Sequence, residues 1–368
     1  MTEVSIYKDK VQQFTQTVDV DFIMITEPLN VYYFTGVLIR PHERMLALLI
    51  NTNTNETALV YPALDEGMVT GATNLTKKLP FSDGEDAFQS IYDFTDGQSI
   101  GVEGDVLSFN RYKRLREKFE DENIVAIDTE ISNARGIKTK EEKQLLLDAV
   151  EITEKALADL TSREVIGMTE AEVASYLVDR MKAYGGVGPS FGPIVLTGAN
   201  SALPHGVPGD TRIQSGDFLL IDFGVVTKDN YVSDITRTFI VGEPTDKQRE
   251  IYEAVLAANI AGVKATKKDA VISSIDNSGR HEIESKGYGE YFTHRIGHGL
   301  GLDIHEAPSM DKNNHDTLIS GNVVTIEPGI YIEGYGGVRI EDMLFVDDET
   351  VSLTSYPKSI EDAVLRKG

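Results

Sequence analysis

Short apolar runs separated by polar turns dominate the first third of the chain. Four of these runs predict β-strands, at residues 21–26, 45–50, 57–61 and 99–104. The last run leads into a charged amphipathic stretch, residues 105–120, with the spacing of a helix. Strands that alternate with helices predict a compact α/β domain.

Longer stretches with helical spacing follow in the second part of the chain. Thr139, Thr169 and Thr245 are each followed three residues later by Glu or Gln, and then by apolar residues at helical spacing. This pattern is the capping box, in which side chain and backbone satisfy each other's hydrogen bonds at a helix start. We expect three helices there, and we place the domain boundary in the polar segment before the first one. The predicted domains are residues 1–131 and 132–368.

Two strand–turn–strand units of the second domain each carry a pair of acidic residues. The first unit covers residues 218–241 and the second covers residues 322–346. Their acidic residues are, in order, Asp222, Asp234, Glu327 and Glu341. A carboxylate in an apolar strand is costly to bury unless it is paired or binds a cation. The repeat therefore predicts two antiparallel hairpins whose acids converge on a positive partner.

Three of the seven histidines fall within residues 294–306. His294 and His298 have the spacing of a helical zinc pair, but three nearby glycines weaken a helix, and Arg295 stands where a metalloprotease helix has Glu. We expect extended backbone instead. Because His305 has the opposite strand parity, a turn or bulge at the glycines is needed to bring the three histidines together.

One histidine and four carboxylates suit two divalent cations better than one. Metal pairs about 3.5–4 Å apart activate water and polarise carbonyl groups in hydrolases that include aminopeptidases. Oxygen-rich ligation favours manganese, with cobalt, zinc and iron as alternatives. The chain has no Cys, which excludes disulfide scaffolds, thiolate zinc sites and Cys nucleophiles. The predicted reaction class is hydrolysis at a centre built from Asp, Glu and His.

The negative net charge disfavours nucleic-acid and membrane partners. The chain has 59 Asp and Glu against 35 Lys and Arg, a formal net charge of −24, whereas phosphate-rich surfaces attract clustered cations. No apolar run approaches the ~20 residues of a membrane-spanning helix. The first ten residues lack the pattern of a targeting peptide. We therefore expect a cytoplasmic protein.

The motifs LLIDFG, SDITRTF, HRIGHGLGLDIHE, TIEPGIY and GVRIED occur in the order and spacing of the ligand motifs of the pita-bread metallopeptidases. With its preceding α/β domain, the whole chain resembles the branch of prolidases (Xaa-Pro dipeptidases) and aminopeptidases P; methionine aminopeptidases lack that domain. The resemblance implies an α/β (α+β) fold. It consists of an N-terminal α/β creatinase-like domain and a C-terminal pita-bread domain, which has a pseudo-two-fold antiparallel sheet and flanking helices.

The same resemblance implies a role for each metal ligand. Asp222 would chelate one metal, and His298 and Glu327 would chelate the other. Asp234 and Glu341 would bridge the two metals. Glu327 would also act as the general base, which carries a proton to the leaving nitrogen from the water that bridges the metals and becomes the attacking hydroxide.

Further roles are implied for residues around the metals. His205, in ALPHGVPG, would contact the substrate, and His305 would donate a hydrogen bond to the scissile carbonyl or to the tetrahedral oxyanion as its charge develops. These two histidines and Glu327 form the predicted catalytic set. His294 and Arg339 would line the pocket for the residue after the scissile bond. Arg339 would either bind a dipeptide carboxylate or orient its neighbours.

A dipeptidase is favoured by two features that resemble bacterial prolidases, the loop PHER at residues 41–44 and Arg295. In that group the loop closes over an active site, often that of a partner subunit. His42, Arg44 and Arg295 are therefore predicted to hold the substrate carboxylate; a solvated charged loop is the alternative. Arg40 replaces the acidic or small residue of many members, which leaves the preferred first residue of the dipeptide open.

The prediction is thus a homodimeric, metal-dependent dipeptidase that hydrolyses the Xaa-Pro bond. One alternative is an enzyme like aminopeptidase P that acts on longer peptides. A metal-free pita-bread binding module, or a creatinase-like hydrolase without metals, is the alternative of another class. The sequence disfavours both metal-free options because no ligand position is lost.

Overall fold

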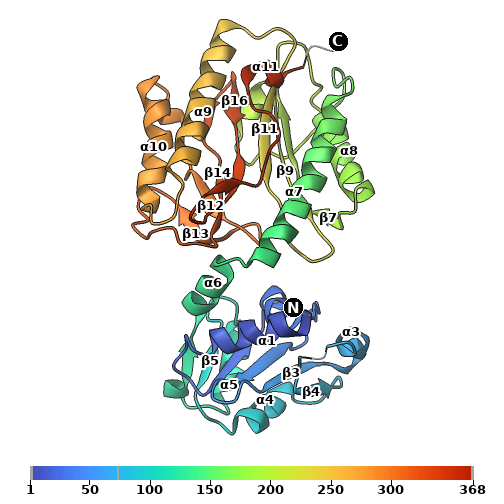
Figure 1. Ribbon diagram of the computed structural model, residues 1–368. Helices are drawn as coiled ribbons and strands as arrows, with labels where there is room; N and C mark the ends of the chain where they lie inside the picture. The colour runs from blue at the N-terminus through green and yellow to red at the C-terminus, as the bar shows by residue number, and fades with distance from the viewer. Residues whose placement is uncertain (1–2, 73, 366–368) are drawn as a thin grey trace. The chain divides into compact units, whose positions relative to one another are not determined.

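The computed structural model describes residues 3–72 and 74–365 (Figure 1). The chain divides into two compact units, Met1–Arg135 and Gly136–Gly368. The boundary that the sequence predicts, between residues 131 and 132, falls inside helix α6 (Asp128–Gly136) and stays a prediction. In the described ranges, none of the helices combines the length and the apolar character that crossing a membrane requires.

The first unit is built on one six-stranded mixed sheet with the order β4-β3-β2-β1-β5-β6. Its strands are β1 (Phe22–Ile25), β2 (Ala47–Asn51), β3 (Thr57–Pro62), β4 (Lys77–Phe81), β5 (Ile100–Val102) and β6 (Ile124–Ala126). Its other helices are α1 (Glu3–Phe14), α2 (Pro28–Thr35), α3 (Glu66–Val69), α4 (Ala87–Thr95) and α5 (Phe109–Arg116). The four predicted strands and the predicted helical stretch are confirmed.

The second unit contains the candidate site. Its helices are α7 (Lys140–Thr161), α8 (Glu170–Ala183), α9 (Asp246–Ala265), α10 (Ile272–Ser285) and α11 (Ile360–Ala363). The strands of its first half are β7 (Gly188–Pro189), β8 (Ile194–Thr197), β9 (Phe218–Phe223), β10 (Val225–Val226) and β11 (Ile235–Val241). Those of its second half are β12 (Gly297–Gly299), β13 (Glu306–Met310), β14 (Val323–Ile326), β15 (Gly329–Ile332), β16 (Gly336–Arg339), β17 (Asp342–Phe345) and β18 (Val351–Ser352), while β19 (Val364–Leu365) returns to pair with β11 of the first half.

The three predicted helix starts are all correct. Thr139, Thr169 and Thr245 are the N-caps of α7, α8 and α9, and each forms the complete, reciprocal capping box. The caps satisfy backbone donors that a helix start otherwise leaves open. The tertiary packing of an apolar face then supplies most of the stability of such helices.

The second unit has two similar halves. In the first, β9 pairs antiparallel with β11, and α7 and α8 contribute to its hydrophobic core. In the second, β14 pairs antiparallel with β17, and α9 and α10 contribute to a second core. Figure 1 shows the strands between these two helix pairs. This arrangement confirms the predicted pseudo-two-fold sheet with flanking helices.

The strands around three of the four acids are shorter than the sequence predicts. Asp234 precedes β11, Glu327 lies between β14 and β15, and Glu341 lies between β16 and β17; Asp222 alone lies inside a strand, β9. A residue outside the regular ladder is not bound to the alternating orientation of strand side chains. The interruptions therefore give three carboxylates the freedom to turn toward a common centre.

Candidate metal centre

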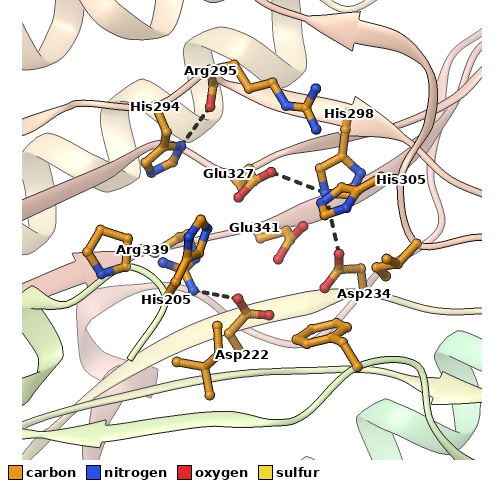
Figure 2. A pocket seen from close by; sticks show the side chains of 14 residues that line it. His205, Asp222, Asp234, His294, Arg295, His298, His305, Glu327, Arg339 and Glu341 are labelled. Atoms are coloured by element: carbon orange, nitrogen blue, oxygen red, sulfur yellow. Dashed lines mark hydrogen bonds and ion pairs between the residues drawn. The ribbon is translucent and has the colours of Figure 1, made fainter. Parts of the chain in front are cut away.

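One cavity of about 340 Å³ collects every residue of the second unit that the sequence assigns to a site (Figure 2). Its lining consists of Phe191, Ile194, Pro204, His205, Asp222, Asp234, His294, Arg295, His298, Ile304, His305, Glu327, Arg339 and Glu341. These residues are far apart in the sequence and come from both halves of the unit. The predicted convergence of the acids and histidines therefore exists in the fold.

Buried side chains in the cavity wall form a cluster of potential metal ligands. Ligand atoms of Asp234, His298 and Glu341 all lie within 4.8 Å of one another. The Nε2 atom of His298 is 3.6 Å from Oδ2 of Asp234 and 3.3 Å from Oε1 of Glu327. Oxygen and imidazole ligands at such separations suit a divalent transition metal.

His298 is placed by extended backbone, as the sequence predicts. It is the middle residue of β12, and the pairing of β12 with β13 shifts register between His298 and Gly299. The Nδ1 atom of His298 is 3.0 Å from the carbonyl oxygen of Gly299. With the proton on Nδ1, the lone pair of Nε2 faces the carboxylates, which is the tautomer of a metal ligand. Burial lowers the pKa of His298 to about 3, so the ring is neutral at physiological pH.

The carboxylates carry a charge that the surrounding protein does not neutralise fully. Three buried oxygens among the described residues, Oδ1 of Asp222, Oδ1 of Asp234 and Oε1 of Glu341, have no hydrogen-bond partner. Burial, and then the neighbouring carboxylates, raise the pKa values of Asp234 and Glu341 well above their usual range. Unpartnered buried acceptors are costly. The residues present therefore fit divalent cations, which would satisfy these oxygens and relieve the repulsion.

Glu327 differs from the other acids in its titration. Burial, together with the negative charge of Asp222, raises the pKa of Glu327 to about 7 against the opposing effect of Arg339. A carboxyl with a pKa near neutrality exchanges a proton readily at physiological pH, which is the property of a general acid–base group. Because Glu327 is also close to His298, it is able to take part in both proton transfer and metal binding.

Arg339 and Tyr331 connect the cluster of potential metal ligands to His294. Arg339 donates hydrogen bonds to Asp222, to Oγ1 of Thr236 (3.1 Å) and to the hydroxyl of Tyr331 (2.7 Å). That hydroxyl is 2.9 Å from Nε2 of His294, whose Nδ1 is 2.7 Å from the carbonyl oxygen of Arg295. With Nδ1 donating to the carbonyl, Nε2 accepts from Tyr331. Burial, and then Arg339, lower the pKa of His294 to about 4, so the ring stays neutral.

This chain of contacts gives Tyr331 a larger role than the sequence indicates. The residue pattern alone assigns Tyr331 to the core or the pocket wall. Its side chain in fact joins two residues of the cavity by its hydroxyl group. The contacts also favour the orienting interpretation of Arg339, because three protein partners already occupy its guanidinium group.

Replacing Tyr331 by phenylalanine is expected to lower kcat/KM about tenfold with little change in metal content. The substitution removes one hydroxyl, and a lost hydrogen bond to a charged group costs about 1.5–3 kcal/mol. The ring and its packing remain. Steady-state kinetics and metal analysis of the purified variant check this expectation. Unchanged kinetics would show that His294 and Arg339 keep their positions without the hydroxyl.

His205 and His305 lie at the accessible side of the cavity, and both are exposed. The ring of His305 stacks edge-on against that of His298, with 4.4 Å between the ring centroids. Partial burial, and then Arg295, lower the pKa of His305. A neutral imidazole next to the potential metal ligands is able to donate one hydrogen bond to a bound substrate or to accept one from it.

His42 and Arg44 belong to the first unit. His42 has a positive φ of 55° in the loop that the sequence singles out. Arg44 is paired with Asp83 through two hydrogen bonds of 2.8 and 2.9 Å. Its backbone carbonyl accepts a hydrogen bond from Arg111. The predicted contact of His42 and Arg44 with substrate stays a prediction.

Comparison with protein families matches residues 144–348 to metallopeptidase family M24. The chain belongs to this family. Residues 8–137 match the creatinase/prolidase N-terminal domain. The predicted fold, an N-terminal creatinase-like domain followed by a pita-bread domain, is therefore confirmed, and so is the prediction of a hydrolase of the metallopeptidase class.

Similarity to relatives and to solved structures extends over nearly the whole chain. An uncharacterized peptidase of Staphylococcus aureus strain USA300 is 39% identical over 339 residues, 92% of this chain and 95% of the relative. A structure described as Xaa-Pro dipeptidase from Bacillus anthracis has a TM-score of 0.89 and 32% identity, with 98% of this chain and 100% of that chain covered. The prolidase from Pyrococcus furiosus has a TM-score of 0.83 and 37% identity over 94% of this chain and 99% of its own.

Proposed function

We propose that this M24 metallopeptidase hydrolyses the Xaa-Pro bond of dipeptides with two divalent cations, of which manganese is the favoured identity. The proposal includes a cytoplasmic homodimer. The observation that carries it is the convergence of four acids and His298 in one cavity, with three carboxylate oxygens that lack a partner among the described residues. The likeness to solved prolidases supports the substrate class.

The metal-binding residues of the proposal are the four acids and His298 of the cavity wall. Asp222, Asp234, His298, Glu327 and Glu341 would hold the two cations between the hairpins β9–β11 and β14–β17. When bound, such cations lower the pKa of attached water and polarise a carbonyl group, which supplies a nucleophile at neutral pH. Thr236 supports Glu341 by donating a hydrogen bond of 2.8 Å to its Oε2 atom.

Glu327 is the proposed proton carrier. Its carboxylate, 3.3 Å from Nε2 of His298, would accept a proton during attack on the scissile carbonyl and return it to the leaving imino nitrogen of proline. His305, at the accessible side of the cavity, would donate a hydrogen bond to the developing oxyanion. His205, from the loop on the other wall, would hold the substrate backbone. His294 would border the space for the proline ring.

Arg295 is the proposed partner of the dipeptide carboxylate. It lines the cavity, and its guanidinium donates through Nη1 to Oγ of Ser309 at 2.9 Å. Arg339, in contrast, is engaged with Asp222, Thr236 and Tyr331. A guanidinium group recognises a carboxylate by paired hydrogen bonds. We propose that this contact, with His42 and Arg44 as further contributors, selects dipeptides.

Replacing Arg295 by alanine is expected to raise KM about tenfold or more for Xaa-Pro dipeptides. Loss of a charged hydrogen-bonding partner costs roughly 1.5–3 kcal/mol. The corresponding dipeptide amides, which lack the carboxylate charge, serve as the internal control and should change little. Equal losses for the acids and the amides would contradict the assignment.

The alternative function is that of an aminopeptidase P acting on longer peptides. It is kept because a structure described as X-Pro aminopeptidase from Thermotoga maritima has a TM-score of 0.85 and 31% identity. The test is hydrolysis of a panel of Xaa-Pro dipeptides and Xaa-Pro-containing tripeptides, each with manganese, cobalt, zinc or iron. Faster cleavage of dipeptides such as Ala-Pro and Leu-Pro supports the proposal, and much faster cleavage of tripeptides overturns it.

A further inference from the structure

Three buried carboxyl side chains outside the proposed metal ligands hold the segments that carry the cavity's other histidines. They are Glu170 on α8, Asp276 on α10 and Glu306 at the start of β13. Each accepts hydrogen bonds from backbone N–H groups of a segment that contributes to the cavity wall. A fixed backbone is what allows a side chain to keep the geometry that a reaction requires.

Glu170 closes the loop that carries His205. Its side chain is fully buried, and its Oε1 atom accepts from the backbone N–H of Thr197 at 2.8 Å and from Nδ2 of Asn200 at 3.0 Å. Its Oε2 atom accepts from the backbone N–H of Gly209 at 3.0 Å. One carboxylate thereby joins the two ends of the loop, at residues 197–200 and at residue 209.

The tip of the same loop is not held by burial. Leu203 and Val207 are 54% and 85% exposed, and His205 between them is exposed as well. Exposed loop tips with little packing open at low free-energy cost. Ser201 also ties the early part of the loop to β16, through a 2.8 Å hydrogen bond from the N–H of Gly337. The later part, residues 203–208, is joined to α8 at Gly209, whose N–H donates to Glu170 and whose carbonyl oxygen accepts from the N–H of Ala171 at 3.1 Å.

Asp276 holds the segment that carries His294 and Arg295. Its fully buried carboxylate accepts from the backbone N–H of Ile296 at 3.0 Å and is paired with Arg280. Arg280 in turn donates to the carbonyl oxygens of Phe292 at 2.9 Å and His294 at 3.0 Å. The pair thus fixes the segment from both of its ends.

Glu306 holds the turn before it, which carries His305. Its Oε1 atom accepts from the backbone N–H groups of Leu302 at 2.9 Å and Asp303 at 3.1 Å, and its Oε2 atom accepts from Nζ of Lys138 at 2.7 Å. A Cβ atom at Gly301 would approach both Glu306 and Lys138 to 2.8 Å. The glycine therefore leaves the room that this buried ion pair needs.

We propose that Glu170, Asp276 and Glu306 are positioning residues, each of which sets the place of one histidine segment of the cavity. Glu170 acts on His205, Asp276 on His294 and Glu306 on His305. The negative charge matters because every carboxylate oxygen faces donors. An amide of the same shape would turn its own N–H group toward one of them, and the repulsion would release that end of the segment.

The decisive experiment compares Glu170→Gln with Glu172→Gln by hydrogen–deuterium exchange of the unmutated and variant proteins, without substrate. Glu172 is the matched control because it lies on the same helical turn, is exposed, and serves in a capping box. The chain itself uses Gln in that role, at Gln248 of α9, so the cap survives the change. The backbone amides of Thr197 and Gly209, which donate to Glu170, should exchange about tenfold faster in Glu170→Gln and at an unchanged rate in Glu172→Gln.

A second measurement tests whether Glu170 affects catalysis by positioning His205. It rests on the proposed function, because it uses hydrolysis of an Xaa-Pro dipeptide. Glu170→Gln should lower kcat/KM about tenfold with unchanged metal content. In the double variant with His205→Ala, the loss should exceed that of His205→Ala alone by no more than about threefold, since residues that act through one another are not additive.

The outcomes separate the inference from the proposed function. Failure of the unmutated enzyme to cleave the dipeptide contradicts the function and leaves the exchange result as the test of positioning. Losses that multiply in the double variant overturn the inference, because Glu170 would then act on something other than His205. If Glu170→Gln does not fold, Asn200→Ala serves as the second variant. It removes one hydrogen-bond donor to Glu170 and keeps Glu170 itself. This variant should speed the exchange of the same backbone amides, those of Thr197 and Gly209, to a smaller extent. Unchanged exchange overturns the inference.

Discussion

Replacing His298 by alanine is expected to remove bound metal and to lower kcat/KM by more than about a hundredfold. Even residues that only support metal ligands typically cost about 10–100-fold in affinity or activity, and His298 supplies the single nitrogen among the predicted ligands. Metal analysis after dialysis and steady-state kinetics measure the two effects.

His281→Ala is the matched control for this substitution. His281 is exposed on α10 and does not line the cavity. We expect its variant to retain full metal content and activity. A His298→Ala protein with unchanged activity would contradict the proposed metal mechanism, and normal metal content together with lost activity would assign His298 to the reaction instead of to metal binding.

Removing divalent metal with a chelator is expected to lower the melting temperature, and the difference between loaded and metal-free protein should grow as pH rises. A metal present at about one hundred times its Kd stabilises by about 2.7 kcal/mol, which corresponds to roughly 5–10 °C for a unit of this size. Metal binding requires ionised carboxylates, so protons compete with it. Differential scanning fluorimetry between pH 5 and pH 8, with and without manganese, measures the difference.

The sign follows from the raised pKa values of the acids. Glu327 changes from a usual value of 4.5 to about 7 in the folded protein, chiefly through burial. Its contribution to the stability of the metal-free protein is therefore present below about pH 4.5 and is lost as the pH rises through about 7. Asp234 and Glu341 shift in the same direction. Bound metal offsets this loss of stability at higher pH, because it stabilises the ionised carboxylates.

The titration of His298 does not change the pH dependence expected for the stability difference. Its folded pKa of about 3 keeps it neutral, with or without metal, over the whole range of the measurement. Glu327→Gln removes the group that titrates near pH 7 and should flatten the upper part of the pH profile of the metal-free protein. A melting-point difference that does not change between pH 5 and pH 8 would contradict the assignment.

The local elements of the second unit were predictable because their signals are local. Each capping box at Thr139, Thr169 and Thr245 is complete within four residues, and each one starts a helix. The extended backbone at His298 was also predictable, because neighbouring glycines disfavour a helix. The strand ends around Asp234, Glu327 and Glu341 were not, since an interrupted ladder depends on partners that are distant in the sequence.

Tyr331 and Glu170 show the same limit within the site. Tyr331 resembles any buried aromatic residue of a strand until the fold brings Arg339 and His294 to its hydroxyl. Glu170 resembles an ordinary acidic residue in the first turn of a helix. Its contacts with Thr197 and Gly209 arise only when the loop closes over the start of α8.

The sequence by itself determined which residues take part in the candidate centre: an acid pair in each of two repeated hairpins, and histidines in a glycine-rich segment. It did so because the chemistry requires particular residue types, and the repeat places them at equivalent positions. The tertiary structure decided which of them are bound by other residues and which oxygens remain unpartnered. Hydrogen bonding and burial act between segments that lie far apart along the chain, and these interactions set the pKa values and orientations on which the chemistry depends.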